Sequence, residues 1–255
     1  MPSKTISAVS VLLAAAPLYI SLAGCSVRED RELCPATLIV NLPAADSAAS
    51  KVYIRHLTPE GSARETSAEL TAEESEIRLP VPRSTFIAVA SSIPLEDGRW
   101  LIPEGSPCQE AYICRRRVTV GNDCARMTAR FQKEFCRMKI EFSSPPEGLS
   151  TRIRGQFCGS TLEGKLIEGM FLSPFRPGED VCVPRQGDSS LLLDIENQGE
   201  GIIRTFALGE YLRKAGYDWE KDNLDDVCVF LDFVRSEAVI ATGIWTTAIP
   251  IDILL

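Results

Sequence analysis

Most of this chain alternates hydrophobic and polar residues with a period of two, which is the pattern of a β-strand with one buried face. Between Phe135 and Phe142, for example, Met138 and Ile140 alternate with charged side chains. Turns rich in Gly, Pro, Asp and Ser separate one such segment from the next. We therefore expect strands over residues 37–42, 51–57, 76–81, 85–91, 115–120, 126–132, 135–142, 152–158, 181–183, 190–196, 227–234 and 237–245.

Two segments break this rhythm. From Leu208 to Ala215 the apolar residues recur at positions i, i+3, i+4 and i+7, which predicts one short amphipathic helix, and Gly216 is well placed to end it. Residues 63–76 are acidic and polar without a regular period, so they predict a loop or a short frayed helix.

The order of these elements predicts an all-β fold. Turn signals recur roughly every 8–12 residues, and strands do not alternate with long helices, which is typical of β-sandwiches. Two sets of strands can be distinguished along the chain. We therefore predict two tandem β-sandwich domains, at residues 34–133 and 134–255, with the short helix in the second.

The N-terminus has the pattern of an export signal. Lys4 precedes an apolar run, residues 6–18, that is too short to cross a bilayer. A Leu-Ala-Gly-Cys motif ending at Cys25 then resembles the bacterial lipoprotein box. We interpret residues 1–24 as a lipoprotein signal peptide, Cys25 as the lipidated residue and residues 25–33 as a charged tether. The alternative is an ordinary signal peptide followed by a chance cysteine.

The remaining cysteines point to export rather than to metal binding. The chain has nine cysteines, so lipidation of Cys25 leaves eight, and none of them forms a Cys-x-x-Cys pair. Cys108, Cys114 and Cys124 are close in sequence and are the best candidates for a local disulfide. Cys136 shares the apolar face of its strand, which favours a buried free thiol over a bridge.

Composition and motifs argue against several classes of function. The chain has 255 residues, 45% of them hydrophobic, and a formal net charge of −8 without a basic patch, which argues against nucleic-acid binding. The single histidine, His56, lies in an expected strand, and the chain contains no P-loop and no Gly-x-Ser-x-Gly motif. We therefore expect no enzyme activity, no catalytic residue, no metal site and no cofactor besides the covalent lipid on Cys25.

Three stretches together carry a family resemblance. They are Cys25 with its charged tether and Cys34-Pro35 before the strand at 38–42, the segment Leu208-Gly-Glu-Tyr-Leu-Arg-Lys-Ala-Gly-Tyr-Asp-Trp219, and Asn223-Leu-Asp-Asp-Val227 followed by a strand with Asp232 and by residues 239–245. In these stretches the chain resembles the fimbrillin anchor-subunit family, the FimB-like lipoproteins of type V pili.

This resemblance implies that the two sandwiches are transthyretin-like. It also implies a palmitoylated lipoprotein, anchored in the cell outer membrane and exposed on the surface, that attaches and terminates a fimbrial fibre. Its partners are then fimbrillin pilus subunits, joined by β-strand addition, in which main-chain hydrogen bonds and alternate side-chain pockets fix the register. Because the lipidated Cys25 must stay attached, the first strand should remain in place, and such a subunit ends a fibre rather than extends it.

The C-terminal segment is the candidate partner-binding site. Ile249, Ile251, Ile253 and Leu255 share one face of an extended segment. They form either a strand that docks on a fimbrillin or the last strand of the chain's own second domain. Pro250 lacks a main-chain donor and favours an edge position in both cases.

The alternative function is a free-standing surface adhesin or glycan-binding module on the same scaffold. Its candidate ligand-binding residues are Tyr217 and Trp219, whose rings are suited to stacking on a sugar. Packing of the loop after the helix against the sandwich explains the same two rings without a ligand.

Overall fold

The computed structural model describes residues 35–42, 51–57, 63–69, 76–96, 99–143, 148–197, 202–232, 237–242 and 245–250. Within these ranges almost all regular structure is β-strand, and α2 (Leu208–Lys214) is the one α-helix. The predicted all-β class is therefore confirmed. The described ranges contain no helix with both the length and the apolar character of a membrane span. The predicted signal peptide, Cys25 and the tether lie outside the described residues, as do Ile251, Ile253 and Leu255.

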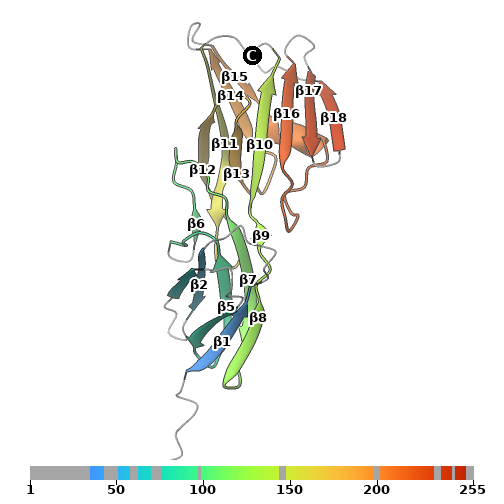
Figure 1. The fold of residues 1–255 in the computed structure, drawn as a ribbon. Helices are drawn as coiled ribbons and strands as arrows, with labels where there is room; N and C mark the ends of the chain where they lie inside the picture. The colour runs from blue at the N-terminus through green and yellow to red at the C-terminus, as the bar shows by residue number, and fades with distance from the viewer. Residues whose placement is uncertain are drawn as a thin grey trace, which may run out of the picture. The chain divides into compact units, whose positions relative to one another are not determined.

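Apart from β6 (Trp100–Leu101), the strands before residue 134 form two sheets that face each other (Figure 1). One has the strand order β4-β1-β8 and the other β3-β2-β5-β7-β9. Apolar side chains from both sheets, among them Leu38, Leu79, Phe86 and Met127, form one buried cluster. The bounds are β1 (Ala36–Asn41), β2 (Lys51–Leu57), β3 (Ala63–Glu69), β4 (Glu76–Val81), β5 (Thr85–Ser91), β7 (Tyr112–Thr119), β8 (Cys124–Thr128) and β9 (Gln132–Lys133).

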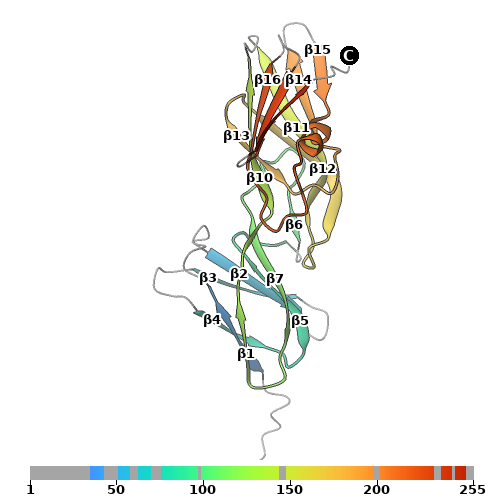
Figure 2. The ribbon, with the colours of Figure 1, turned by 90° about the vertical axis from the view of Figure 1, so that its right-hand side faces the viewer.

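The later strands form two further sheets, with the orders β13-β10-β16-β17-β18 and β12-β11-β14-β15 (Figure 2). Met138, Ile153, Leu193 and Val229 belong to the buried cluster that these sheets share with α2. The bounds are β10 (Phe135–Phe142), β11 (Leu149–Ser160), β12 (Leu166–Phe175), β13 (Asp180–Pro184), β14 (Leu192–Asn197), β15 (Ile202–Phe206), β16 (Val227–Asp232), β17 (Glu237–Thr242) and β18 (Trp245–Pro250).

One segment that precedes β7 packs into this second cluster. Leu95, Trp100 and Ala111 are among its members, and β6 (Trp100–Leu101) pairs antiparallel with β11. Gly159 on β11 lies so close to β6 that an added Cβ would be 1.8 Å from the carbonyl oxygen of Trp100. The chain from Ala36 onward forms one compact unit. Its division into domains near residue 133 therefore stays a prediction.

The helix and its glycine end follow the sequence prediction. Leu208, Tyr211 and Leu212 of α2 are buried, as the i, i+3, i+4 spacing requires. Gly216 follows with a φ of 81° and donates its N–H to the carbonyl of Arg213 at 3.0 Å. A left-handed residue of this kind satisfies the last carbonyls of a helix and suits glycine, which has no Cβ to clash.

The prediction of a loop or frayed helix over residues 63–76 is wrong for its first half. Ala63–Glu69 forms β3, an edge strand paired antiparallel with β2 along its whole length. Pairing with a neighbour, rather than its own hydrophobic pattern, makes this polar segment a strand. The single strand expected over 237–245 is also wrong, since β17 ends at Thr242 and β18 begins at Trp245. Strands β6, β12 and β15 were not expected.

The cysteines are arranged differently from the sequence expectation. The seven described cysteines are free thiols, and Cys136 is fully buried as expected. Cys114 is buried and Cys124 is exposed, whereas Cys108 contacts Cys182 on β13. The expected local bridge among Cys108, Cys114 and Cys124 is therefore wrong, because the loop before β7 carries Cys108 to another sheet.

Strand edges and a candidate binding groove

The first strand occupies an interior position in its sheet. β1 pairs antiparallel with β4 and parallel with β8, so that Leu38 lies opposite Leu79 on one side and Ala125 on the other. Leu38 and Val40 are fully buried. The chain's own first strand therefore fills this place between two neighbours and supplies part of the core.

The last described strand lies at a sheet edge. β18 pairs antiparallel with β17, and Ile249 lies opposite Ala238 with 7% of its surface exposed, inside the core cluster. For the described residues, the segment is thus the last strand of the chain's own sheet, the second of the two alternatives. Among the described strands none pairs with the other side of β18.

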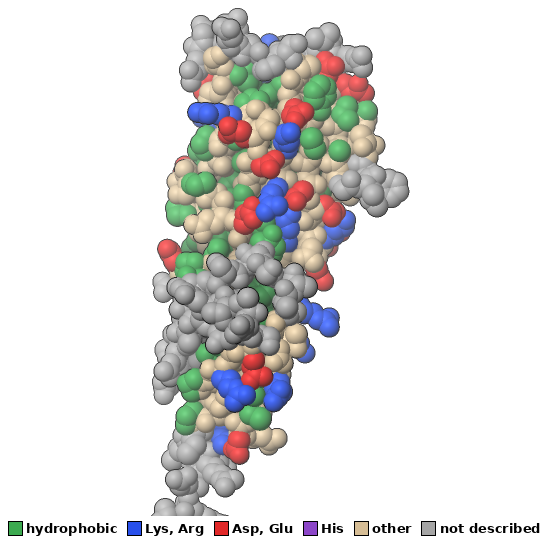
Figure 3. Space-filling view, viewed as in Figure 1, with side chains coloured by type: hydrophobic (Ala, Val, Ile, Leu, Met, Phe, Trp, Pro, Cys, Tyr) green, Lys and Arg blue, Asp and Glu red, His purple; other side chains and the backbone are tan. Residues whose placement is uncertain are grey.

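The middle of the outward face of β16, β17 and β18 is apolar, and the pair Asp232 and Glu237 lies at one end of it. Phe230, Val239 and Ala248 form one cross-strand row, and Phe230 is 36% exposed. Figure 3 shows hydrophobic side chains over the middle of these strands and acidic side chains at their upper end, whereas side chains of both charge signs are interspersed over the rest of the described part of this face. The edge of β18 therefore borders a surface that suits an apolar partner.

The two aromatic candidates lie in the loop after α2 and differ in exposure. Their rings make an edge-to-face contact with centroids 4.7 Å apart. Tyr217 is 8% exposed, and its hydroxyl donates to the carbonyl of Asp225 at 2.9 Å. Burial, together with the nearby Cys136 thiol, raises the pKa of Tyr217. Tyr217 thus packs the loop onto the sandwich, while Trp219 is only partly buried and lines a groove.

This groove has a volume of about 540 Å³ and a buried charge network along its wall. Glu134 is 5% exposed and accepts from Arg115 at 2.5 Å and from Arg185 at 3.0 Å. Arg115 also donates to the hydroxyl of Ser160 at 2.6 Å. Since the one carboxylate of Glu134 holds both guanidinium groups, the network is a rigid wall that joins β7, β11 and the end of β13.

Arg185 also fixes the loop that carries Trp219. Its guanidinium donates to the carbonyls of Trp219, of Lys221 at 2.7 Å and of Asp222 at 3.3 Å. The indole is therefore held beside polar side chains that line the same groove, including Gln132 and Glu163. A partly exposed aromatic ring flanked by hydrogen-bonding groups can stack on a sugar ring and bind its hydroxyls.

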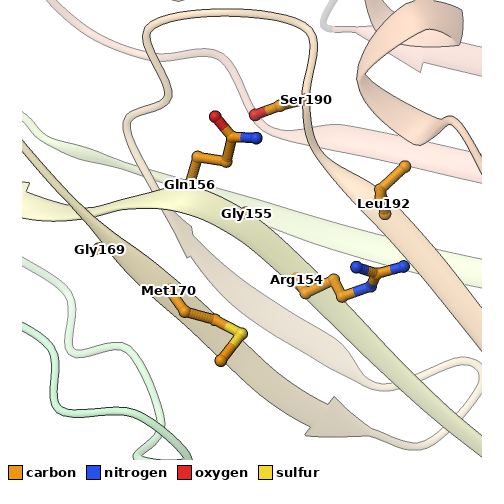
Figure 4. A pocket seen from close by; sticks show the side chains of 7 residues that line it. All are labelled: Arg154, Gly155, Gln156, Gly169, Met170, Ser190 and Leu192. Atoms are coloured by element: carbon orange, nitrogen blue, oxygen red, sulfur yellow. The ribbon is translucent and has the colours of Figure 1, made fainter.

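A second hollow, of about 320 Å³, lies over β11, β12 and β14 (Figure 4). The side chains of Gln156 and Ser190 point toward one another at one end of it, and Met170, which is 51% exposed, lies at the other (Figure 4). Close to this hollow, Asp194 is 3% exposed and accepts from Arg154 at 2.9 Å and from Thr205 at 2.7 Å.

The described residues contain no group of three or more His, Cys, Asp or Glu side chains that could bind a metal ion. His56 lies on β2, opposite Arg64 and Ala88 in the strand register. Arg115, Glu134 and Arg185, which build the groove wall, had no signal in the sequence. They are single charged residues up to 70 positions apart, and only the strand pairing brings them together.

No protein-family model matches the sequence, and no curated protein matches it. Solved structures share its fold. A provisionally assigned polysaccharide-binding protein from Bacteroides thetaiotaomicron is 12% identical over 84% of this chain and 98% of its own, with a TM-score of 0.62. A provisionally assigned adhesin from Bacteroides ovatus is 12% identical over 88% of this chain and 97% of its own, with a TM-score of 0.58. The fimbrial anchor protein Mfa2 from Porphyromonas gingivalis is 11% identical over 84% of this chain and 99% of its own, with a TM-score of 0.56. At the level of the fold, the resemblance to fimbrial anchor proteins is confirmed.

Proposed function

We propose that this chain is a lipid-anchored structural subunit that attaches a fimbrial fibre to the cell outer membrane and terminates it. The observation that carries this proposal is the interior position of β1, whose residues Leu38 and Val40 are fully buried between β4 and β8. A strand built into the core in this way cannot be exchanged for a partner's strand without unfolding the sheet. Strand exchange at this position is what would extend a fibre.

The position of β1 also suits an anchor. β1 begins at Ala36, 11 positions after Cys25. A lipid on Cys25 would therefore be joined covalently, through a short tether, to a strand that holds the sandwich together. Fibre tension would then be transmitted to the membrane through the folded core. The fold shared with Mfa2, a fimbrial anchor protein by name, supports the same role.

The proposed joint to fimbrillin is the edge of β18 that no described strand covers, with the apolar row beside it. An extended segment of a fimbrillin would add to this edge by main-chain hydrogen bonds. Its apolar side chains would cover the row of Phe230, Val239 and Ala248. By their alternation in the sequence, Ile251, Ile253 and Leu255 share the face of the core-facing Ile249 rather than that of Ala248, so they are a separate candidate contact. The proposed joint rests on Phe230, Val239 and Ala248 alone.

Deletion of this chain in its own cells tests the anchor role. We expect assembled fibres to be released into the medium, and we expect Cys25→Ala to release the protein itself from the membrane fraction. Cys124→Ala, which removes an exposed cysteine of β8, is the matched control and should leave both fibres and protein attached. Fibres that remain on the cells after deletion would contradict the proposal.

The joint is tested by charge insertion on the apolar face. Ala248→Arg should abolish cross-linking of this chain to fimbrillin on intact cells, because Ala248 is exposed and belongs to the apolar row. Glu168→Arg on β12 introduces the same side chain at another exposed strand position and should not affect cross-linking. Equal cross-linking of both variants would remove the β18 face from the proposal.

A second candidate function is a surface adhesin or glycan-binding module, and the groove beside Trp219 favours it. The provisional assignment of a structural neighbour to polysaccharide binding supports the same choice. Titration of the purified chain with a panel of glycans should then change its tryptophan fluorescence. Trp219→Ala should abolish the change, and Gln156→Ala in the other hollow should not. A panel without any response would exclude this function for the sugars tested.

A further inference from the structure

Two cysteines from distant parts of the sequence meet on the outer side of β13. The sulfur atoms of Cys108 and Cys182 are 2.8 Å apart although the residues are separated by 74 positions. Cys182 lies on β13 opposite Arg137 of β10. Cys108 lies in the connection between β6 and β7 and packs against the second core cluster. Both side chains are half-buried.

A second contact holds the same segment on the same surface. Glu110, two residues after Cys108, accepts two hydrogen bonds from the guanidinium of Arg137, each 2.6 Å long. The carbonyl of Gln109 accepts from Cys108 at 3.4 Å and from Cys182 at 3.6 Å. Because a bidentate Arg–carboxylate pair fixes geometry as well as distance, residues 108–110 are held against β10 and β13 without any covalent link.

We propose that Cys108 and Cys182 are a disulfide site that links the segment between β6 and β7 to β13. Each thiol loses its proton, a sulfur–sulfur bond forms, and the two electrons pass to an oxidant. The oxidant is a disulfide, such as that of a thiol–disulfide oxidoreductase or of oxidised glutathione, and it leaves as two thiols. The sulfurs have to approach by less than about 1 Å to reach bonding distance.

The other described cysteines are placed differently. Cys114 is buried in the first core cluster, where its sulfur accepts from the amide of Arg130 at 3.3 Å. Cys158 is buried and contacts the carbonyl of Ile167 at 3.8 Å. Cys124 and Cys228 are exposed on β8 and β16. Cys136 is fully buried, and its thiol donates to the carbonyl of Arg137 at 3.5 Å. The direct contact between two sulfur atoms therefore selects Cys108 and Cys182.

The link would close a loop that contains β7 to β12 and would fix the connection before β7 covalently on β13. Burial raises the pKa of the Cys108 thiol, and the neighbouring Cys182 raises it further, so spontaneous oxidation at neutral pH should be slow. Formation in the cell depends on the proposed export to an oxidising compartment, whereas the geometry does not depend on the proposed function.

Disulfide exchange on the purified mature chain tests the site. The reduced protein is incubated with oxidised glutathione in mildly alkaline buffer, the remaining thiols are alkylated, and a non-reducing digest is analysed by mass spectrometry. We expect a peptide that contains Cys108 joined to a peptide that contains Cys182, and a thermal unfolding midpoint that rises on oxidation and returns on reduction. Cys124→Ser, the matched control, should give the same linked peptides.

Cys108→Ser and Cys182→Ser should each abolish the linked peptide and the rise in midpoint while leaving the reduced protein folded. Alkylation of both thiols after exchange, or linkage of either cysteine to another partner, would overturn the assignment. The same alkylation applied to membranes prepared from cells tests the native state. A linked pair there supports the proposal, and two free thiols would overturn it for the native protein without affecting the anchor role.

Discussion

Substitution of the buried Glu134 should lower the stability of the folded protein. Its side chain is 6% exposed, and the guanidinium groups of Arg115 and Arg185 beside it are 13% and 14% exposed. Glu134→Gln leaves two cations buried without their counter-charge. Breaking a buried ion network in this way typically lowers the free energy of unfolding by about 3–5 kcal/mol. Urea unfolding of the purified chain measures the change.

Glu179→Gln provides the comparison for this prediction. Glu179 is 62% exposed and lies 3.9 Å from the exposed Arg176, a surface pair that should contribute less than about 1 kcal/mol. A loss in Glu134→Gln that is no larger than the loss in Glu179→Gln would show that water reaches the network and that it does not stiffen the groove wall.

The buried Asp194 should make the stability of the folded protein depend on pH. Burial raises its pKa, but hydrogen bonds from Thr205, Arg154 and Arg152 outweigh burial and hold the pKa below the ordinary value. A lowered pKa in the folded state stabilises the protein above the unfolded value of about 3.9, and this stability is lost as the pH falls toward the folded pKa. Asp194→Asn should therefore have a lower free energy of unfolding than the wild type near neutral pH. On acidification its free energy of unfolding should fall by less than that of the wild type. Unfolding free energies measured over a pH series, with the exposed Asp180→Asn as control, check both expectations.

At the scale of the element, the end of α2 gives a test of backbone conformation. Gly216 has a φ of 81°, and an added Cβ would meet nothing within 4 Å. Gly216→Ala should therefore lower the free energy of unfolding by about 1–2 kcal/mol through left-handed strain alone. Gly121→Ala has the same open surroundings without the positive φ and should be neutral or slightly stabilising. Equal thermal midpoints for the two variants would contradict this explanation.

The elements also show where sequence patterns predict structure and where they do not. The strand over Phe135–Phe142 and the helix with its Gly216 end were predictable, because burial on one face imposes a local period. β3 and β12 are both edge strands, and their polar residues, Gly169 and Pro174 carry no such period. Their structure depends on pairing with β2 and β11. The meeting of Cys108 with Cys182, like the groove wall, depends on the same long-range pairing.

For the whole molecule, the segment around β6 should couple the unfolding of the two sets of sheets. Leu95, Trp100 and Ala111 precede β7 in the chain but are buried in the cluster of the later strands. We therefore expect wild-type protein to unfold in one transition that is the same by tryptophan fluorescence and by circular dichroism. If the segment around β6 couples the two sets of sheets, the predicted division near residue 133 does not separate two independently unfolding domains.

Gly159→Ala tests this coupling at its tightest point. The new Cβ would lie 1.8 Å from the carbonyl oxygen of Trp100, a main-chain atom that cannot move aside without breaking the pairing of β6 with β11. We expect the variant to unfold in two separate transitions, since each set of sheets keeps its own core. Leu101→Ala changes a 38% exposed side chain of β6, opposite Gly159, and should retain a single transition. One transition in Gly159→Ala at the wild-type midpoint would show that β6 does not couple the halves. Two transitions already in the wild type would show that 34–133 and 134–255 unfold independently.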